Sequence, residues 1–318
     1  MSNVAVMQET AMQKLQRKWK EGKYLCVGLD PVLEDIPEDL KSHLEWPAEK
    51  QMGEYGYLKY VGIRNALAEA VIFDFLKKVV DSTHEFAAAY KPNEQFYKRF
   101  GHCGMRALER ICQYITENYP DILLILDAKY SDLGNTNKAA AEFAFGLCCA
   151  DSVTLNPLPG KEQGLDAFFE YPDKLFFVLG EMSHKGAKEF GGLEIQPTSI
   201  SLASHIAKTV ERWNGNGNMG LVVGATCSDQ RIRAMRHFAP SCVFLMPGLG
   251  RQGGDMMTTV RAGLDSNGEG ILINVSSYIT SPKHKAEGED HFEAVARAAK
   301  NFHEDIKKEV ELAPQPAA

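Results

Sequence analysis

Eight short apolar runs recur along the chain, and each of them ends in a polar or glycine-rich stretch. Within these runs the apolar residues are continuous and do not alternate with polar ones. Continuous apolar character is typical of strands that are buried on both faces, as in a parallel sheet. The runs, which we interpret as strands, are residues 24–29, 86–90, 122–126, 152–155, 175–179, 219–223, 242–246 and 271–275.

Segments with apolar residues at helical spacing lie between most of these strands. Eight strands that alternate with helices predict an α/β fold with one domain over residues 1–318, a (β/α)8 or TIM barrel. A doubly wound open sheet is the alternative. No G-x-G-x-x-G motif follows the first strand, however, which weakens a dinucleotide-binding interpretation. The predicted helices are residues 65–82, 105–117, 136–149, 199–213, 229–238 and 255–262.

Two connections, which follow the first and the fifth predicted strands, are long. The first spans residues 31–85 and the second spans residues 181–218. A glycine-containing part of the second, residues 183–197, is typical of an active-site lid. At the two ends of the chain we expect a helical extension over residues 1–20 and a frayed tail over residues 309–318.

Composition narrows the class of protein. Hydrophobic residues make up 44% of the chain and charged residues 24%, which excludes a disordered chain. Lys and Arg number 35 against 42 Asp and Glu, a net charge of −7, so we expect no nucleic-acid partner. No apolar stretch approaches the length of a membrane span, and residues 1–23 contain no signal-peptide core.

The cysteine and histidine patterns bear on the cellular compartment and on the presence of a zinc site. The seven cysteines are spread over the whole chain and include no C-x-x-C motif, which favours a reducing, cytoplasmic compartment. The nine histidines include neither H-x-H nor H-E-x-x-H, so we expect no zinc site.

Polar residues follow the predicted strands at their carboxyl ends. The active site of a (β/α)8 barrel lies at that end of the strands, so these residues are candidates for it. For any one of them alone, an ordinary polar strand end is the better interpretation. The candidates are Asp30, Lys91, Asp127, Lys129, Asn156, Ser183 and Pro247.

The segment from Asp127 to Asp132 carries a more specific signal. Asp127 and Lys129 are two residues apart, so both side chains point to the same face of an extended strand. Lys91 from the neighbouring strand and Asp132 from the following loop would complete an alternating Lys–Asp–Lys–Asp cluster. Opposite charges about 4 Å apart interact by roughly 4 kcal/mol at an effective dielectric of about 20. A purely structural network of ion pairs is the alternative interpretation.

The sequence resembles the orotidine 5′-phosphate decarboxylase family, in motifs whose order and spacing hold from about residue 24 to residue 280. Asp127-x-Lys129-x-x-Asp132 matches the D-x-K-x-x-D signature, which related phosphosugar enzymes share. The segment from Pro247 to Asp255 resembles the family's P-G-x-x-x-Q-G-G-D and makes the likeness more specific. Further matching segments are Val27-Gly-Leu-Asp30, Lys91-Pro-Asn93, Asp132-Leu-Gly-Asn-Thr136 and Met182-Ser-His184.

The resemblance implies a cofactor-free barrel that converts orotidine 5′-monophosphate to UMP and CO2, the last step of de novo pyrimidine nucleotide synthesis. Lys129 would stand beside the reacting ring carbon and protonate it. Asp127 would face the departing carboxylate, and Lys91 and Asp132 would fix the positions of both. In the family the active sites form at a homodimer interface, where Asp132 and Thr136 would serve the partner subunit's site.

The resemblance also assigns residues to the rest of the substrate. Asp30 and Lys91 would hold the ribose hydroxyl groups. Ser183 and Gln252 would contact the pyrimidine, and Gln252 would also reach the phosphate. Further candidates for substrate binding in the matching segments are Asn93, Pro247, Gly253 and Gly254.

One departure from the family pattern concerns the phosphate. The family usually places an arginine after the last strand, whereas this chain has Ser277 there. Backbone N–H groups of Gly253, Gly254, Ser276 and Ser277 are candidate phosphate donors. Arg251 is the one cationic side chain in the sequence of the last two loops, so we expect it to supply the displaced guanidinium. A solvent-facing arginine is the alternative.

Two other functions stay open on the sequence alone. One is a Mg²⁺-dependent 3-keto-sugar-phosphate decarboxylase or hexulose-phosphate synthase on the same barrel, which would bind its metal through a carboxylate. The Ser183 and Gln252 segments favour a pyrimidine site over it. The other is a non-catalytic nucleotide-binding barrel, which the missing arginine favours and the four intact charged residues disfavour.

Overall fold

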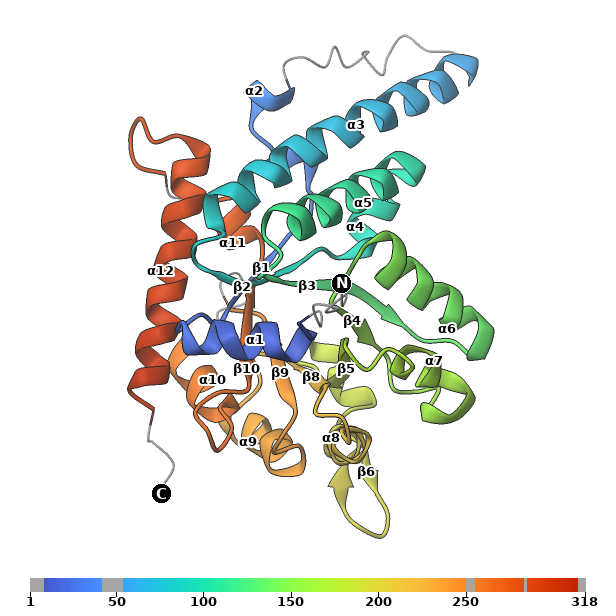
Figure 1. Ribbon diagram of the computed structural model, residues 1–318, viewed down its shortest axis with the longest axis vertical. Helices are drawn as coiled ribbons and strands as arrows, with labels where there is room; N and C mark the ends of the chain where they lie inside the picture. Colours follow the sequence, from blue (N-terminus) through green and yellow to red (C-terminus); the bar gives the residue numbers. More distant parts are fainter. Residues whose placement is uncertain (1–8, 42–53, 250–254, 283–284, 314–318) are drawn as a thin grey trace, which may run out of the picture.

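The computed structural model describes residues 9–41, 54–249, 255–282 and 285–313, and its framework is a closed barrel of parallel strands (Figure 1). The strands follow one another around the barrel in chain order, and the last one returns to pair with the first. Their bounds are β1 (Leu25–Gly28), β2 (Ala87–Lys91), β3 (Leu123–Tyr130), β4 (Ser152–Leu155), β5 (Leu175–Glu181), β8 (Met219–Val223), β9 (Val243–Pro247) and β10 (Ile271–Val275).

Each barrel strand forms where the sequence has a continuous apolar run, because such a strand packs against side chains on both of its faces. Every residue of β1, β2, β4, β8 and β10 is buried. The barrel closes through parallel pairing of β1 with β10, in which Leu25 lies opposite Ile273. This pairing confirms the predicted (β/α)8 barrel. The open doubly wound sheet is wrong, because β1 and β10 are hydrogen-bonded to each other.

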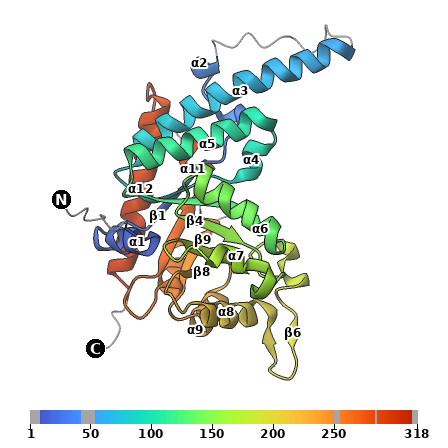
Figure 2. The same cartoon turned by 45° about the vertical axis from the view of Figure 1, so that its right-hand side comes forward.

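Helices cover the outside of the barrel (Figures 1 and 2). The bounds of α9 (Asp229–Phe238) are those predicted, whereas α3 (Glu54–Thr83) begins before the expected residue 65. Two glycines, Gly56 and Gly62, weaken the helical pattern there. The other helices are α4 (Glu94–Lys98), α5 (Gly101–Asn118), α6 (Gly134–Ala141, continued by π-helical turns over Glu142–Leu147), α7 (Asp166–Phe169), α8 (Leu202–Trp213), α10 (Met256–Gly263), α11 (Ser277–Thr280) and α12 (His291–Glu311).

The N-terminal helix α1 (Ala11–Lys20) lies across the end of the barrel at which the strands begin (Figure 1). The indole Nε1 of Trp19 donates a 2.9 Å hydrogen bond to the carbonyl of Ile271, at the start of β10. Lys14 forms a 2.8 Å ion pair with Asp151, just before β4. The helix therefore covers the end of the barrel opposite the one at which the strands finish.

The two long connections carry local structure of their own. After β1 the chain forms a 3-10 turn (Leu33–Asp35) and the short helix α2 (Glu38–Lys41) before α3. After β5 it forms a second 3-10 turn (Lys185–Glu189) and an antiparallel hairpin of β6 (Glu194–Ile195) and β7 (Ile200–Ser201). This hairpin projects beside α8 (Figure 2). The segment expected to be a lid, residues 183–197, thus contains the 3-10 turn and the first strand of the hairpin, and its role as a lid stays a prediction.

The C-terminal boundary differs from the expectation that residues 309–318 are frayed. Helix α12 continues through Glu311, and the Glu309 carboxylate accepts a 2.9 Å hydrogen bond from the Arg261 guanidinium of α10. This contact fixes the last turn of the helix against the barrel. Residues 314–318 lie outside the described residues.

Two further observations concern the part of the chain that the structure describes. None of its helices is both long and apolar enough to cross a membrane. All seven cysteines are free thiols, six of them buried.

Candidate active site

The carboxyl ends of β2 and β3 bring Lys91, Asp127 and Lys129 into one cluster. The Nζ atom of Lys91 lies 2.8 Å from Oδ2 of Asp127, and the Nζ atom of Lys129 lies 2.5 Å from Oδ1. The side chains of Lys91 and Asp127 are buried, whereas that of Lys129 is 39% exposed. A ligand at the barrel mouth therefore has access to the Lys129 ammonium, while Lys91 is enclosed.

The path of β3 differs from the regular strand that the sequence predicts. Its register with β4 passes from Leu126 opposite Val153 to Tyr130 opposite Leu155, so β3 contains extra residues in a bulge. Lys129 lies in this bulge with φ of 55°. The side chains of Asp127 and Lys129 do converge, as predicted. They converge because of the bulge, however, and not because alternate residues of a regular strand point to the same face.

The backbone of Lys129 is strained. A non-glycine residue in the left-handed region costs about 1 kcal/mol or more, whereas glycine adopts it freely. The N–H group of Lys129 is held in place by a 2.9 Å hydrogen bond to Oγ1 of Thr154. Backbone geometry alone would favour glycine at this position.

Two neutral side chains also bind the Asp127 carboxylate. Thr154 Oγ1 donates to Oδ1 at 2.9 Å, and Asn93 Nδ2 donates to Oδ2 at 3.3 Å. Thr154 was missed by sequence reasoning. The available signal was a hydroxyl group within the otherwise apolar run of β4.

The electrostatics of the cluster favour its charged form. Burial by itself would raise the pKa of Asp127, but Lys91 and Lys129 outweigh it and hold that pKa well below its usual range. Burial would lower the pKa of Lys91, but the nearby Asp127 and Asp30 carboxylates raise it above the ordinary lysine value. Asp127 is therefore an anion and Lys91 a cation at neutral pH.

Asp30 joins this group from the end of β1. Its Oδ1 atom accepts a 3.2 Å hydrogen bond from the backbone N–H of Asn93. The side chain of Asn93 in turn caps α4, since its Oδ1 atom accepts from the N–H of Gln95 at 3.1 Å. Asn93 thus ties Asp30 to Asp127 and begins the helix that follows.

A cavity of about 280 Å³ lies beside Asp30 and Lys91. At the edge of this cavity the side chain of Ser276 packs directly on Gly28. A Cβ atom at position 28 would come within 1.9 Å of the Ser276 Oγ atom, so this contact needs a glycine. Five of the residues that line the cavity were predicted, from segments far apart in the sequence, and others, such as Asn274 and Tyr278, were not. The predicted residues that line it are Asp30, Lys91, Pro247, Ser276 and Ser277.

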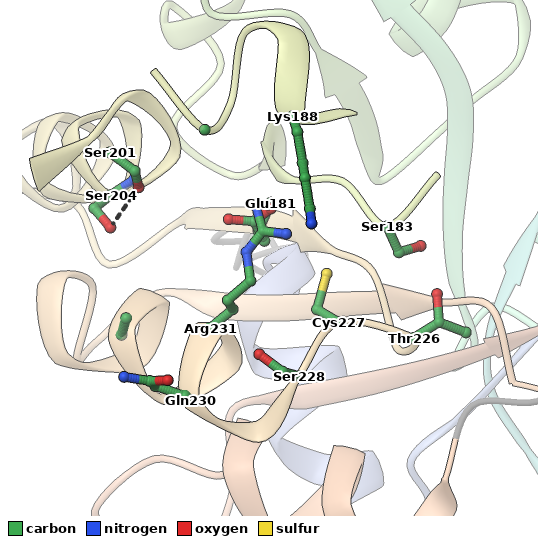
Figure 3. Close-up of a pocket in the computed structure, with 12 residues that line it drawn as sticks. Glu181, Ser183, Lys188, Ser201, Ser204, Thr226, Cys227, Ser228, Gln230 and Arg231 are labelled. Atoms are coloured by element: carbon green, nitrogen blue, oxygen red, sulfur yellow. Dashed lines mark hydrogen bonds and ion pairs between the residues drawn. The ribbon is translucent and has the colours of Figure 1, made fainter. Parts of the chain in front are cut away.

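Ser183 lines a different cavity, of about 690 Å³, between the connection after β5 and the start of α9 (Figure 3). Its other lining residues include Glu181 and Arg231, which sequence reasoning did not single out. The structure therefore divides the predicted substrate-binding residues between two cavities.

Asp132 does not join the cluster of its own chain, and its expected place in the partner subunit's site stays a prediction. Its side chain is exposed, and its Oδ1 atom accepts a 2.7 Å hydrogen bond from the N–H of Leu133. Among the described residues, no hydrogen bond or ion pair joins it to Lys91 or Lys129. The reason is local, because the side-chain amide of Asn137 donates to the Asp132 carbonyl at 2.5 Å and fixes the loop after β3. Thr136 is also exposed.

Four of the residues expected to bind the phosphate or the pyrimidine lie outside the described residues. Arg251, Gln252, Gly253 and Gly254 all lie in the undescribed range 250–254. Asp255, which follows them, accepts a 3.1 Å hydrogen bond from the N–H of Thr258 and caps α10. Elsewhere, across the described ranges, no group of three or more His, Cys, Asp or Glu side chains gathers in a way that could hold a metal ion.

Comparisons with known proteins identify the family of this chain. Residues 23–290 match the family described as "Orotidine 5'-phosphate decarboxylase / HUMPS family". A protein of Janthinobacterium sp. named orotidine 5′-phosphate decarboxylase is 34% identical over 279 residues, which cover 86% of this chain and 90% of that protein. A relative of the same name in Flavobacterium johnsoniae is 32% identical over 94% of this chain and 96% of its own length.

Solved structures extend the similarity to the fold. The structure of Leishmania donovani OMP decarboxylase superimposes with a TM-score of 0.74 at 31% identity, covering 96% of this chain and all of that one. The structure of Leishmania donovani UMP synthase matches with a TM-score of 0.73 at 32% identity, and this chain covers 57% of it. The sequence match spans most of the barrel, including the segment that carries Asp127 and Lys129, and the chain therefore belongs to the orotidine 5′-phosphate decarboxylase / HUMPS family.

Proposed function

We propose that this chain decarboxylates orotidine 5′-monophosphate to UMP and CO2 without a cofactor. The observation that carries the proposal is the Asp127 carboxylate held between two lysines, of which Lys129 is accessible at the barrel mouth. The relatives named orotidine 5′-phosphate decarboxylase, at 30–34% identity, support it. The set Lys91, Asp127 and Lys129 carries an excess of positive charge, which suits a substrate that brings a carboxylate.

In the proposed reaction the bond between the pyrimidine ring and the carboxylate carbon breaks, and CO2 leaves. The electron pair stays on the ring carbon, and a proton moves from the Lys129 ammonium to that carbon. The cation next to the ring stabilises the developing negative charge before it gives up the proton. Lys129 then regains a proton from water.

Asp127 has two tasks in this proposal. Its ionised carboxylate aims the Lys129 ammonium, to which it is bound at 2.5 Å. It would also face the carboxylate of the bound substrate, and the repulsion between the two charges is relieved when CO2 leaves. Lys91, buried and bound to the other oxygen of Asp127, keeps the carboxylate ionised and in place.

The rest of the nucleotide is assigned to residues around the two cavities. Asp30 and Lys91 would hold the ribose hydroxyl groups from the 280 Å³ cavity, with Asn93 and Pro247 beside them. Ser183 and Gln252 would contact the pyrimidine. Backbone N–H groups of Gly253, Gly254, Ser276 and Ser277 would bind the phosphate.

The proposal includes a homodimer in which Asp132 and Thr136 complete the partner subunit's site. Two exposed apolar side chains beside these residues support an interface there. Leu133 after β3 is 62% exposed and Leu158 after β4 is 78% exposed. A contiguous exposed patch of apolar side chains is typical of a surface that a partner covers, and these two leucines are candidates for such a patch.

The function is tested by mixing the purified protein with orotidine 5′-monophosphate and following the loss of its ultraviolet absorbance and the formation of UMP. We expect turnover that is unchanged by EDTA. Activity that EDTA abolishes and Mg²⁺ restores would instead support a metal-dependent enzyme of the same barrel group. Binding of UMP without any turnover would support a non-catalytic nucleotide-binding barrel.

Arg251 is expected to contribute to phosphate binding in place of the family arginine that Ser277 replaces. A charge-assisted hydrogen bond is worth roughly 1.5–3 kcal/mol, so Arg251→Ala should weaken UMP binding by about 10- to 150-fold. Binding of uridine, which lacks the phosphate, should stay the same. Both dissociation constants can be measured by isothermal titration calorimetry. Equal UMP affinities in the variant and the wild type would leave the phosphate to backbone N–H groups.

A further inference from the structure

The 690 Å³ cavity lies directly under the connection that follows β5 (Figure 3). Most of the residues that line it have polar side chains, with Lys188 above and Ser201 and Ser204 at one end. The segment from Ser183 to Gly192 therefore borders an open cavity and not a packed core. Specific polar contacts must hold the start of this segment in place.

One of these contacts is an ion pair between the last residue of β5 and the helix α9. The Glu181 side chain is buried, and its carboxylate pairs with the guanidinium of Arg231. Figure 3 shows the Arg231 guanidinium directly against Glu181, between Lys188 and Cys227. The pair thus joins the end of a barrel strand to the outer layer of helices.

A second set of contacts joins the end of β5 to Gly224, the residue that follows β8. The carbonyl of Glu181 accepts a 2.8 Å hydrogen bond from the N–H of Gly224. The side chain of Ser183 packs on Gly224 so closely that a Cβ atom there would lie 2.6 Å from the serine Oγ. Ser183, which follows Glu181 by two residues in the sequence, is therefore held in place close to the ion pair.

The ion pair by itself contributes little to the stability of the fold. Burial raises the pKa of Glu181 above its ordinary value, even though Arg231 acts to lower it. A carboxyl group with a raised folded-state pKa favours the fold only while it is protonated, and this contribution is lost as pH rises through that pKa. At neutral pH the ionised pair brings little stability, and replacement of a buried pair by apolar side chains is often neutral. The pair does, however, fix the end of β5 against α9, which is a role in geometry.

We propose that the Glu181–Arg231 ion pair is a positioning device that holds Ser183 where the pyrimidine ring is recognised. Arg231 acts through Glu181, which fixes the end of β5, and Glu181 in turn fixes the first turn of the connection that carries Ser183. Neither charged residue needs to touch the substrate. The proposal rests on the proposed function, because it uses the assignment of Ser183 to the pyrimidine.

The test is the double variant Glu181→Met/Arg231→Met, which removes both charges and leaves no unpaired one behind. We expect its melting temperature to stay within a few degrees of that of the wild type. The dissociation constant for UMP should rise roughly 3- to 10-fold, the equivalent of one misplaced hydrogen bond. Binding of ribose 5-phosphate, which has no pyrimidine, should be unchanged. The conservative Arg231→Lys variant should restore part of the UMP affinity.

The control is the double variant Asp229→Asn/Arg233→Met, which removes a 2.8 Å ion pair on the exposed face of the same helix. It should bind both ligands as the wild type does. Unchanged UMP affinity in the Glu181/Arg231 double variant would overturn the positioning role, and so would equal weakening of UMP and ribose 5-phosphate. A wild-type protein that binds ribose 5-phosphate and UMP equally, or turns over no orotidine 5′-monophosphate, would overturn the proposed function itself.

Discussion

Replacement of Lys129 by alanine is expected to lower kcat/KM for orotidine 5′-monophosphate by at least about 10³-fold while the fold survives. The variant loses both the proton donor, worth about 10²- to 10⁴-fold, and the cation that stabilises the developing charge. The fold survives because the Lys129 side chain is 39% exposed. Asp127 also keeps its contacts with Lys91, Thr154 and Asn93.

Turnover is measured from the ultraviolet absorbance of the substrate at enzyme concentrations high enough to detect a slow reaction. Thermal unfolding followed by circular dichroism checks the fold. The matched control is Lys300→Ala, which removes an exposed lysine paired with Glu304 at 3.8 Å on α12 and lining neither cavity. The control should react as the wild type does. A folded Lys129→Ala protein with turnover within tenfold of the wild type would contradict the assigned role.

Mixing two inactive variants, Lys129→Ala and Asp132→Ala, is expected to restore activity. If Asp132 serves the partner subunit's site, a mixed dimer contains one site with both native groups and one with neither. Random pairing of subunits across a twofold interface makes half of the dimers mixed, so about a quarter of the wild-type activity should return. The measurement is the specific activity of an equimolar mixture after subunit exchange.

The matched control for this experiment is a mixture of Lys129→Ala with Asp127→Asn. These two residues contact each other at 2.5 Å within one chain, so no mixed dimer holds an intact pair and no activity should return. Subunit exchange is verified by native mass spectrometry with one variant isotopically labelled. If exchange is complete and the first mixture stays inactive, Asp132 does not act across an interface.

The sequence carries most of the information about the fold. Strands buried on both faces need continuous apolar runs, and a chain with eight such runs separated by helical patterns has few other ways to bury them. The helix α9 was predicted to the residue because its polar and apolar positions follow one period over residues 229–238. The start of α3 was missed, since Gly56 and Gly62 interrupt the pattern that marks a helix.

The candidate site was predictable as far as residue types at strand ends allow. Lys91, Asp127 and Lys129 were singled out because parallel strands bring their carboxyl ends to one rim, and the structure does bring the three together. Asp132 was expected to complete the cluster of the partner subunit, which a single chain does not contain, and in its own chain it lies in a loop held by a hydrogen bond from Asn137. Sequence spacing does not report such a loop contact.

What the sequence determined by itself is therefore the barrel and the identity of its charged strand ends, because local periodicity encodes both. The bulge that turns Lys129 toward Asp127, the hydroxyl of Thr154 beneath them and the pairing of Glu181 with Arg231 were decided only by the tertiary structure. Each of these contacts joins segments that the chain separates by 25 residues or more, or depends on the register between two strands. Such contacts arise from how strands and helices pack, and no local pattern in the sequence records them.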